Sequence, residues 1–371
     1  MIKGRRVVFV LGNLELGGAE RQALILAQHL VDFEQAEVEV WGFNTSGPVA
    51  EICAQHGIAS RVVPYPHHAD QAAAMSQFAA LLRDARPDIL LPYTILPNVV
   101  CGLTWETTGA GLCVWNQRDE GIIAFDAKLE HEAARRTPLF IANSQAGARF
   151  LTTRLNVESA KIHVIPNGIA PLPPQLNRRG WRERLQIEES SFVACMIANL
   201  HANKDHATLL QAWRLVVNAL EQTAVLVLAG RHYGAYESLV KLTNELGIER
   251  YVRFAGQVGD VAGLLSAADI GVFSSRSEGC PNGVLECMYA GLPVVGTDIE
   301  GIREVAGTNL LAPPGDAETF TASILRLANA PRLRSKIGEE NQKRVAANYT
   351  AGRMCEDTVS LLSKSIHRLP T

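Results

Sequence analysis

The 371-residue sequence lacks three features that would place it in other classes of protein. Its seven cysteines are dispersed, with no Cys-x-x-Cys pair and no zinc-like spacing, which indicates a reduced, intracellular protein. Apolar runs such as AVLVLAG (224–230) are far shorter than the roughly 18 residues of a membrane-spanning helix. Positive charge is not in excess, because 35 basic and 38 acidic residues give a net charge of −3; this argues against a nucleic-acid-binding protein.

The N-terminal residues are not expected to act as a secretion signal. The N-terminal residues MIKGRRVVFVLGN begin with basic residues, but their apolar part is short and runs directly into a glycine loop. We therefore predict that they form a buried strand, and we expect a cytoplasmic protein. No Gly-x-x-x-x-Gly-Lys-Ser/Thr P-loop is present, and the first glycine loop does not match the Gly-x-Gly-x-x-Gly dinucleotide motif.

Short apolar runs alternate with amphipathic segments along most of the chain. Continuous apolar strands separated by helices are typical of a parallel sheet covered on both faces. The pattern occurs twice, so we predict an α/β fold with two Rossmann-like, doubly wound parallel-sheet domains. The expected strands are 7–11, 38–43, 60–65, 88–93, 112–117, 139–144 and 162–168, then 192–200, 224–230, 252–257, 268–275, 292–298 and 309–314.

The boundary between the two domains is predicted at the proline-rich stretch IAPLPPQLNRRG. In such sheets ligands bind at the carboxyl ends of the strands, so functional residues are expected in strand-to-helix loops. The expected division is an N-terminal domain at 1–170, a linker at 171–185, a C-terminal domain at 186–350, and a C-terminal helix at 351–371 that returns toward the N-terminal domain.

Two such loops carry candidate anion-binding residues. In LGNLELGGAERQA (11–23), Gly17 and Gly18 allow close backbone approach to a ligand at a helix N-terminus; the alternative is an ordinary tight turn with Glu20 in the first helical turn. In ANLHANKDHATLLQAW (198–213), Lys204 comes just before a helix, where a cation is disfavoured by the helix dipole. A bound diphosphate would account for this lysine, and a solvent-exposed lysine is the alternative.

The third loop, SEGCPNGVLE (277–286), contains two glutamates at a fixed spacing. We expect a helix from about Gly283 through Gly291, with unpaired N–H groups at Gly283, Val284 and Leu285. Glu278 and Glu286 would then border one pocket and accept hydrogen bonds from sugar and ribose hydroxyls on either side of a diphosphate. The alternative is a loop acid and a first-turn acid favoured by the helix dipole.

In combination these motifs resemble those of retaining glycosyltransferases of family 4, which have the GT-B architecture with two domains facing a central cleft. Glu278 and Glu286 match that family's Glu-x7-Glu motif. The resemblance covers nearly the whole chain through GGAE in the first loop, PNGI (166–169), NLHANKDH, AGR (229–231), FAGQV (254–258), EGCPNGVLE and AGLPVVGTD.

The resemblance implies a UDP-sugar donor held mainly by the C-terminal domain, with the acceptor bound mainly by the N-terminal domain. Glu286 would bind the ribose, Glu278 would face the donor sugar, and Lys204 would neutralise the diphosphate. The expected catalytic residues are Glu278, Lys204 and Asp119, and the expected sugar-donor contacts are Gly17, Gly18, Asn199, Lys204, Arg231, Gln257, Val258, Asn282, Gly283, Val284, Leu285 and Glu286.

Two positions depart from the family pattern. Asn199 stands where the family often has an arginine, five residues before the lysine, so Arg231 or Arg276 would have to supply the missing cation. A histidine common at the end of the fifth strand is replaced within WNQRDEG (115–121), where Arg118 or Asp119 would line the cleft instead. For Asp119, a loop or helix-cap acid is the alternative.

The function implied is retaining transfer of a sugar from a UDP-sugar to a hydroxyl of a glycan or lipid-linked acceptor, in polysaccharide or glycolipid synthesis. No metal is expected, since lysine and helix N–H groups would stabilise the leaving diphosphate and no Asp-x-Asp motif occurs. A lipid-linked acceptor would bring the protein into transient contact with the inner face of a membrane. Two alternatives remain open: a nucleotide-sugar epimerase and a non-catalytic nucleotide-sugar- or glycan-binding subunit.

Overall fold

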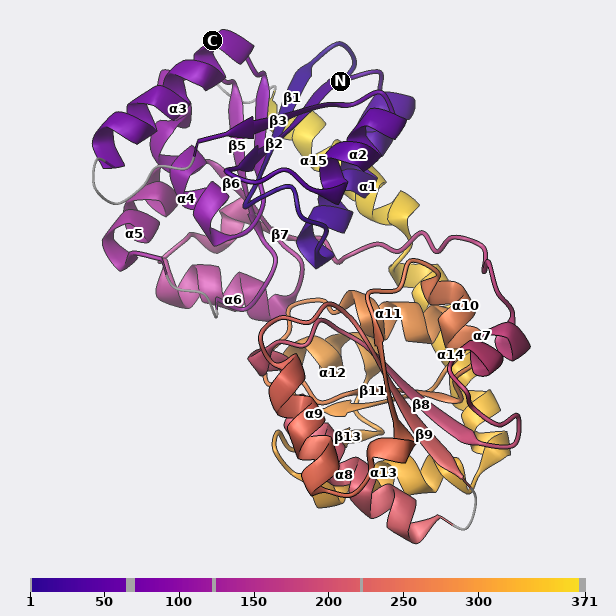
Figure 1. Cartoon of the computed structure of the whole chain (residues 1–371). Helices are drawn as coiled ribbons and strands as arrows, with labels where there is room; N and C mark the ends of the chain where they lie inside the picture. The colour runs from indigo at the N-terminus through magenta and orange to yellow at the C-terminus, as the bar shows by residue number, and fades with distance from the viewer. Residues whose placement is uncertain (1, 65–70, 122–124, 221–222, 367–371) are drawn as a thin grey trace. The chain divides into compact units, whose positions relative to one another are not determined.

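The structure is a computed structural model that describes residues 2–64, 71–121, 125–220 and 223–366 (Figure 1). The chain divides into two compact units: unit 1 comprises residues 1–168 and 351–371, and unit 2 comprises residues 169–350. The last residue of the strand predicted at 60–65 and the end of the predicted C-terminal helix, 367–371, fall outside the described residues.

Unit 1 contains a seven-stranded sheet of order β3-β2-β1-β4-β5-β6-β7, in which every neighbouring pair is parallel. Its described elements are β1 (Arg6–Leu11), α1 (Gly18–Asp32), β2 (Glu37–Phe43), α2 (Pro48–Gln55), β3 (Ala59–Val63), α3 (Gln71–Ala85), β4 (Ile89–Pro92), α4 (Ile95–Thr104), η2 (Trp105–Thr107), β5 (Leu112–Gln117), α5 (Ala127–Arg136), β6 (Leu139–Ala142), α6 (Gln145–Arg154), η3 (Ser159–Lys161), β7 (Ile162–Val164) and α15 (Ala351–Ile366).

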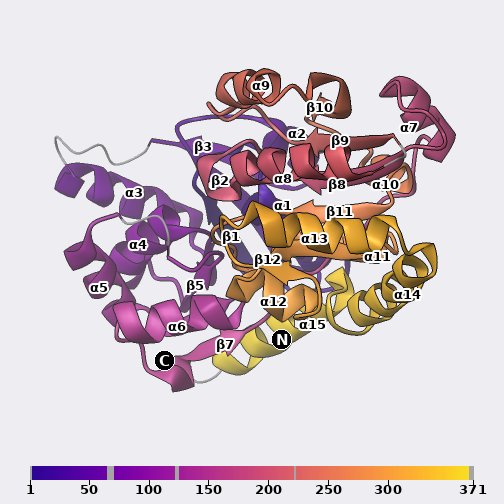
Figure 2. The same cartoon turned by 90° about the horizontal axis from the view of Figure 1, so that it is seen from below.

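The alternation of side chains along β1 explains why both faces of this sheet are covered. Because successive strand residues point to opposite faces, Val7 and Phe9 join one core while Val8 and Val10 join another. The first core includes residues of α1, α2 and α15, and the second includes residues of α3 and α4. Figures 1 and 2 show these two groups of helices on opposite sides of the sheet.

Unit 2 contains a six-stranded parallel sheet of order β10-β9-β8-β11-β12-β13. One large hydrophobic core joins this sheet to its helices. Its described elements are α7 (Arg178–Arg184), β8 (Phe192–Ile197), η4 (Ala202–Lys204), α8 (His206–Ala219), β9 (Ala224–Ala229), α9 (Tyr236–Glu245), η5 (Glu249–Tyr251), β10 (Val252–Gly256), α10 (Val261–Ser266), β11 (Ile270–Phe273), α11 (Asn282–Tyr289), β12 (Val294–Thr297), α12 (Glu300–Ala306), β13 (Leu311–Ala312), α13 (Ala317–Ala328) and α14 (Pro331–Asn348).

The prediction of two doubly wound parallel-sheet α/β domains is confirmed by these two sheets. In each sheet the strand order reverses direction once, between β1 and β4 in unit 1 and between β8 and β11 in unit 2. The carboxyl ends of the two strands at such a reversal diverge into loops on opposite sides, which leaves a crevice for ligands. The loops that follow β8 and β11 are therefore the first place to look for a site in unit 2.

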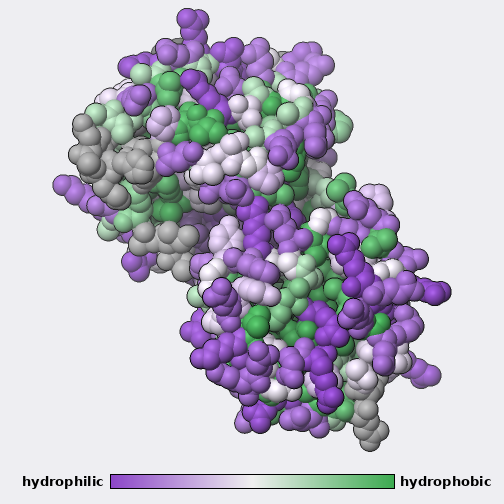
Figure 3. Space-filling model, in the orientation of Figure 1, coloured by the Kyte–Doolittle hydropathy of each residue, from purple (hydrophilic) through white to green (hydrophobic). Residues whose placement is uncertain are grey.

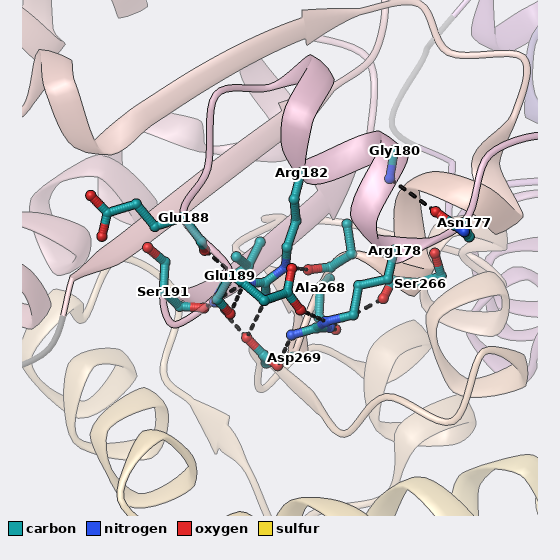
Figure 4. A network of polar contacts seen from close by, with 12 residues as sticks. Asn177, Arg178, Gly180, Arg182, Glu188, Glu189, Ser191, Ser266, Ala268 and Asp269 are labelled. Atoms are coloured by element: carbon teal, nitrogen blue, oxygen red, sulfur yellow. Dashed lines mark hydrogen bonds and ion pairs between the residues drawn. The ribbon is translucent and has the colours of Figure 1, made fainter.

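The segment 171–185, predicted as a linker, lies in unit 2 and includes helix α7. The Arg182 side chain is buried and pairs with Asp269, which also pairs with Arg178 (Figure 4). Burying a guanidinium is unfavourable unless its donors are satisfied, so this network fixes α7 to the rest of unit 2. The carbonyl groups that accept hydrogen bonds from Arg182 belong to Glu188, Glu189, Ser191 and Ala267.

The C-terminal helix α15 belongs to unit 1. Its residues Met354, Cys355 and Leu362 join the core that contains α1. The Cys355 Sγ atom lies 3.8 Å from the carbonyl oxygen of Ile25 on α1. The chain therefore leaves unit 1 after residue 168 and rejoins it at residue 351.

The visible surface is mainly hydrophilic, with hydrophobic residues dispersed among hydrophilic ones (Figure 3). Within the part of the chain that the structure describes, no helix combines the length and hydropathy needed to cross a bilayer. The large hydrophobic side chains that are exposed come from different elements and loops: Phe33, Val62, Leu172, Leu176, Leu215, Tyr233 and Tyr289.

Candidate functional site

The strongest candidate site in unit 2 is formed by the loops that follow β8 and β11. These two strands are hydrogen-bonded neighbours at the point where the strand order reverses. The 198–205 loop carries Lys204, and the 274–281 loop carries Glu278. Lys204 Nζ lies 2.6 Å from Glu278 Oε1, and the two side chains are 21% and 11% exposed.

The backbone around Lys204 is held in an unfavourable conformation. Asp205 has a φ of 47° in the left-handed region, which costs a non-glycine residue about 1–3 kcal/mol. Its buried side chain caps α8 by accepting hydrogen bonds from Thr208, and it also pairs with Arg276 at 3.0 Å. Lys204 thus lies directly before the N-cap of α8, where the helix dipole disfavours a cation, and next to the strained Asp205. Both features are expected where a bound anion compensates for them.

The neighbouring His206 is buried at the first position of α8. Burial, and then the charge of Lys204, lower the pKa of its imidazole to about 4. Its Nε2 atom makes no hydrogen bond in the described structure. His206 is therefore neutral at physiological pH and adds no charge beside Lys204.

Helix α11 begins one residue earlier than the sequence predicted. It starts at Asn282, so the Leu285 N–H donates to the Pro281 carbonyl oxygen at 3.2 Å. The prediction of an unpaired N–H at Leu285 is therefore wrong, because the fourth helical residue already closes the first turn. The first-turn amides that precede this bond belong to Asn282, Gly283 and Val284.

Gly283 is required by close packing of α11 against β8. A Cβ atom at this position would lie 2.3 Å from the carbonyl oxygen of Ile197, the last residue of β8. Glu286, on the same helix, is half-buried. Burial raises the pKa of the Cys195 thiol on β8, and the charge of Glu286 raises it further. These two observations place the first turns of α11 beside β8.

Asn199 joins the loops that follow β8 and β9. Its Oδ1 atom accepts a hydrogen bond from the Arg231 N–H at 3.0 Å. The Arg231 carbonyl oxygen accepts a hydrogen bond from the Leu200 N–H at 2.8 Å. The Nε atom of the Arg231 side chain donates to Gln257 Oε1 at 3.1 Å. Val258 packs its half-buried side chain against the core of unit 2. Asn199 thus bridges two loops. Of the two candidate replacement cations, Arg231 and Arg276, Asn199 fixes the backbone of Arg231.

Arg276, the other candidate replacement cation, is anchored to the 198–205 loop. Its Nε donates a hydrogen bond to the buried Asp205 carboxylate. Its backbone N–H donates to the backbone carbonyl oxygen of Asn203 at 2.8 Å. These contacts fasten the 274–281 loop to the 198–205 loop.

The sequence analysis missed an aromatic stack at the same edge of the sheet. His232 stacks on Tyr236 with ring centroids 3.8 Å apart, and Tyr236 meets Phe254 edge-on at 5.4 Å. His232 lies in the loop before α9, so the stack does not follow from a helical spacing.

The candidate residues of unit 1 lie in separate loops of that unit. Gly17 is the N-cap of α1, and a Cβ atom there would lie 2.5 Å from Glu20 Oε2; Gly18 is the first residue of the helix. In the second loop, Asp119 Oδ1 accepts hydrogen bonds from Gln117 Nε2 and Gly121 N–H, both at 2.7 Å. Burial raises the Asp119 pKa despite these bonds. This arrangement matches the alternative of a loop acid.

Arg118, next to Asp119, points to other partners. Its guanidinium donates to Asn167 Oδ1 and lies 5.3 Å from the centre of the Tyr93 ring. Asn167 belongs to the PNGI motif, so the cation joins two of the motifs that the sequence analysis singled out in this unit.

Two family models match the chain, one in each unit. The model described as Glycosyltransferase Family 4 matches residues 16–171, and the model described as Glycosyl transferases group 1 matches residues 191–330. Each unit is thus similar to a glycosyltransferase family model over most of its length.

Individual relatives match over part of their length. EpsD of Bacillus subtilis is 32% identical over 197 residues, which are 52% of this chain and 50% of that protein. A UDP-Gal:α-D-GlcNAc-diphosphoundecaprenol α-1,3-galactosyltransferase of Escherichia coli is 27% identical over 208 residues, which are 54% of each chain. The chain thus spans about half the length of the curated relatives it matches.

Solved structures match over nearly the whole chain. HepE of Anabaena, crystallised in complex with UDP-glucose, superposes with a TM-score of 0.84 at 20% identity, covering 97% of this chain and 100% of that one. This likeness extends through both units, so the fold is GT-B.

Proposed function

We propose that this GT-B protein is a retaining glycosyltransferase that moves a sugar from a UDP-sugar to a hydroxyl of a glycan or lipid-linked acceptor. The observation that carries the proposal is the pair formed by Lys204 and Glu278 at the strand-order reversal of unit 2. The UDP-glucose bound to HepE and the lipid-linked acceptor in the name of the galactosyltransferase support this choice of substrates. Synthesis of a cell-surface polysaccharide or glycolipid follows from such an acceptor.

The diphosphate of the sugar donor would lie between Lys204 and the N-terminus of α11. Lys204 supplies a full positive charge, and the first-turn amides of Asn282, Gly283 and Val284 supply N–H donors and the positive end of the helix dipole. Arg231, fixed by Asn199, is the second cation that we assign to this diphosphate. Glu286 would accept hydrogen bonds from the ribose, and the loop of Gln257 and Val258 would meet the uracil.

Glu278 would orient the transferred sugar. Both hydrogen bonds that it accepts from described side chains end on Oε1, one from Lys204 and one from Ser275. Oε2 is therefore available to a sugar hydroxyl. A negative charge at this place also favours the positive charge that develops on the sugar ring as its bond to phosphate breaks.

In the transfer step, the bond between the anomeric carbon and the diphosphate oxygen breaks, and a bond to the acceptor oxygen forms on the same face. The acceptor proton passes to the departing phosphate oxygen, so the products are the glycoside and UDP. Lys204 and the α11 amides stabilise the charge that builds on the leaving diphosphate. Because they neutralise this charge, we propose that the reaction needs no metal ion. We assign no role in this step to Asp119, whose carboxylate is held by hydrogen bonds in a turn of unit 1.

The test is a panel of UDP- and GDP-sugars incubated with a pool of cell glycans and glycolipids, with release of the nucleoside diphosphate as the readout. Acceptor-dependent UDP release that is lost in Glu278→Ala and kept in Glu339→Ala, an exposed acid on α14, supports the proposal. Interconversion of UDP-sugars without UDP release would instead indicate an epimerase. UDP binding without either reaction would indicate a binding subunit. The anomeric configuration of the product, measured by NMR, tests retention, and transfer in excess EDTA tests metal independence.

A further inference from the structure

Two adjacent serines at the end of β11 each contact one of the paired residues of the site. Ser274 and Ser275 are completely buried. Ser274 Oγ donates to the carbonyl oxygen of Lys204 at 2.9 Å, whereas Ser275 Oγ donates to Glu278 Oε1 at 2.7 Å. Adjacent residues leaving a strand point to opposite sides, so one hydroxyl reaches the 198–205 loop and the other reaches the glutamate.

These serines are themselves held by the sheet. The Ser275 carbonyl oxygen accepts a hydrogen bond from the hydroxyl of Thr297, a fully buried residue at the end of β12. Ser274 directly follows β11, which pairs with both β8 and β12. Both hydroxyls therefore start from backbone fixed by neighbouring strands, and neither depends on a mobile surface loop.

The two partners of Glu278 differ in what happens when a diphosphate arrives. Lys204 Nζ is a cation, and a diphosphate carries more negative charge than the glutamate, so the phosphate competes for it. The Ser275 hydroxyl is neutral and buried, so a diphosphate does not attract it away from Glu278. Once Lys204 turns to the diphosphate, Ser275 is the described side chain that still holds Oε1 and keeps Oε2 directed to the sugar.

We propose that Ser275 is a positioning residue for Glu278 and that Ser274 is a positioning residue for Lys204. The inference rests on the proposed function and adds a division of labour to it. Ser275 controls the orientation of the sugar through the glutamate, and Ser274 controls the affinity for the nucleoside diphosphate through the lysine backbone. The consequence is that removing one hydroxyl or the other, one position apart, produces two different kinetic defects.

The experiment compares wild-type protein with Ser275→Ala and Ser274→Ala, using UDP as the binding probe in calorimetry and the UDP-sugar identified by the donor panel for kinetics. Removing a hydrogen bond to a charged group lowers a rate or an affinity by roughly 10- to 100-fold. Ser275→Ala is expected to lower kcat by roughly this factor, with UDP affinity within about twofold of wild type. Ser274→Ala is expected to weaken UDP binding and raise the KM for the sugar donor, with a smaller change in kcat.

A thermal melt of each variant separates loss of positioning from loss of folding. Should Ser275→Ala fail to fold, Ser275→Cys keeps a side chain of similar shape with only a weak donor and is expected to show the same fall in kcat. Ser275→Thr, which keeps the hydroxyl, is expected to restore kcat. A folded Ser275→Ala or Ser275→Cys variant with wild-type kcat, or equal loss of UDP affinity in the Ser274 and Ser275 variants, would overturn the inference alone. Wild-type protein that neither binds UDP nor transfers a sugar would overturn the proposed function, and the inference with it.

Discussion

Lys204 and Glu278 are separated by 74 positions in the chain, yet Lys204 Nζ lies 2.6 Å from Glu278 Oε1. Their contact follows from topology, because β8 and β11 are neighbours in the sheet although β9 and β10 separate them in sequence. The loops that leave their carboxyl ends must therefore meet. A lysine and a glutamate placed there form an ion pair, and the lysine can turn to a more highly charged anion that enters the site.

Glu286→Gln is expected to weaken UDP binding by roughly 10-fold or more while kcat changes little, because a charge-assisted bond to the ribose becomes a neutral one. Glu339→Gln, the same change at an exposed position of α14, should leave binding unchanged. Calorimetric titration with UDP measures both. Unchanged affinity in Glu286→Gln would remove the ribose contact from the proposed site.

Asn199→Ala and Arg231→Gln are expected to weaken UDP binding by similar amounts, because Asn199 acts by fixing the loop that carries Arg231. The double variant should then be little worse than either single one, as for two residues in one unit of interaction. Arg326→Gln, which removes an exposed cation from α13, is the control for net charge. Strictly additive losses in the double variant would show that the two residues act separately.

Gly283→Ala is expected to destabilise unit 2 by about 1–3 kcal/mol, because the new methyl group would collide with the Ile197 carbonyl and push α11 away from β8. UDP affinity should fall as well, since the first-turn amides move with the helix. Gly352→Ala, whose Cβ would meet no atom within 4 Å, should keep or slightly raise stability. Denaturant unfolding and UDP titration provide the two readouts; equal behaviour of the two variants would contradict the packing argument.

The stability of the protein is expected to decrease at mildly acidic pH because of His206. The unfolded chain binds this proton near pH 6.5, but burial and Lys204 lower the pKa in the folded protein to about 4. Protonation therefore favours unfolding. The free energy of unfolding should be independent of this group above about pH 7 and fall on the order of 3 kcal/mol between pH 6.5 and 4, with no further loss below.

His206→Gln should flatten that part of the profile, whereas His56→Gln, at an exposed position, should not. Denaturant unfolding at a series of pH values gives the comparison. An identical pH dependence in wild type and His206→Gln would rule out this histidine as the source.

The positions of the strands were predictable because each is an apolar run between turn signals. β9, for example, was expected at 224–230 and spans Ala224–Ala229. The contact between Lys204 and Glu278 could also have been predicted, because both residues follow strands that a doubly wound sheet places side by side. Their roles in donor binding and catalysis remain predictions.

Other features depend on side-chain partners that no periodicity reveals. Arg182 lies in the segment predicted as a linker, but its guanidinium is buried and donates hydrogen bonds to five acceptors. Asn199 looked like a missing cation, whereas its amide oxygen bridges two loops. The start of α11 was misplaced by one residue, which was enough to assign an unpaired N–H to Leu285. In each case the deciding contact joins elements distant in sequence or depends on the exact phase of a helix.

The most direct test of the account is calorimetric titration of UDP into the wild-type protein, Lys204→Met and Lys336→Met, the last being an exposed lysine on α14. The account predicts that UDP binds the wild type and Lys336→Met alike, and binds Lys204→Met at least roughly 10-fold more weakly, with all three proteins folded. Undetectable binding to wild type, or equal binding to Lys204→Met, would contradict the assignment of the Lys204 and Glu278 pair to a nucleotide-sugar site.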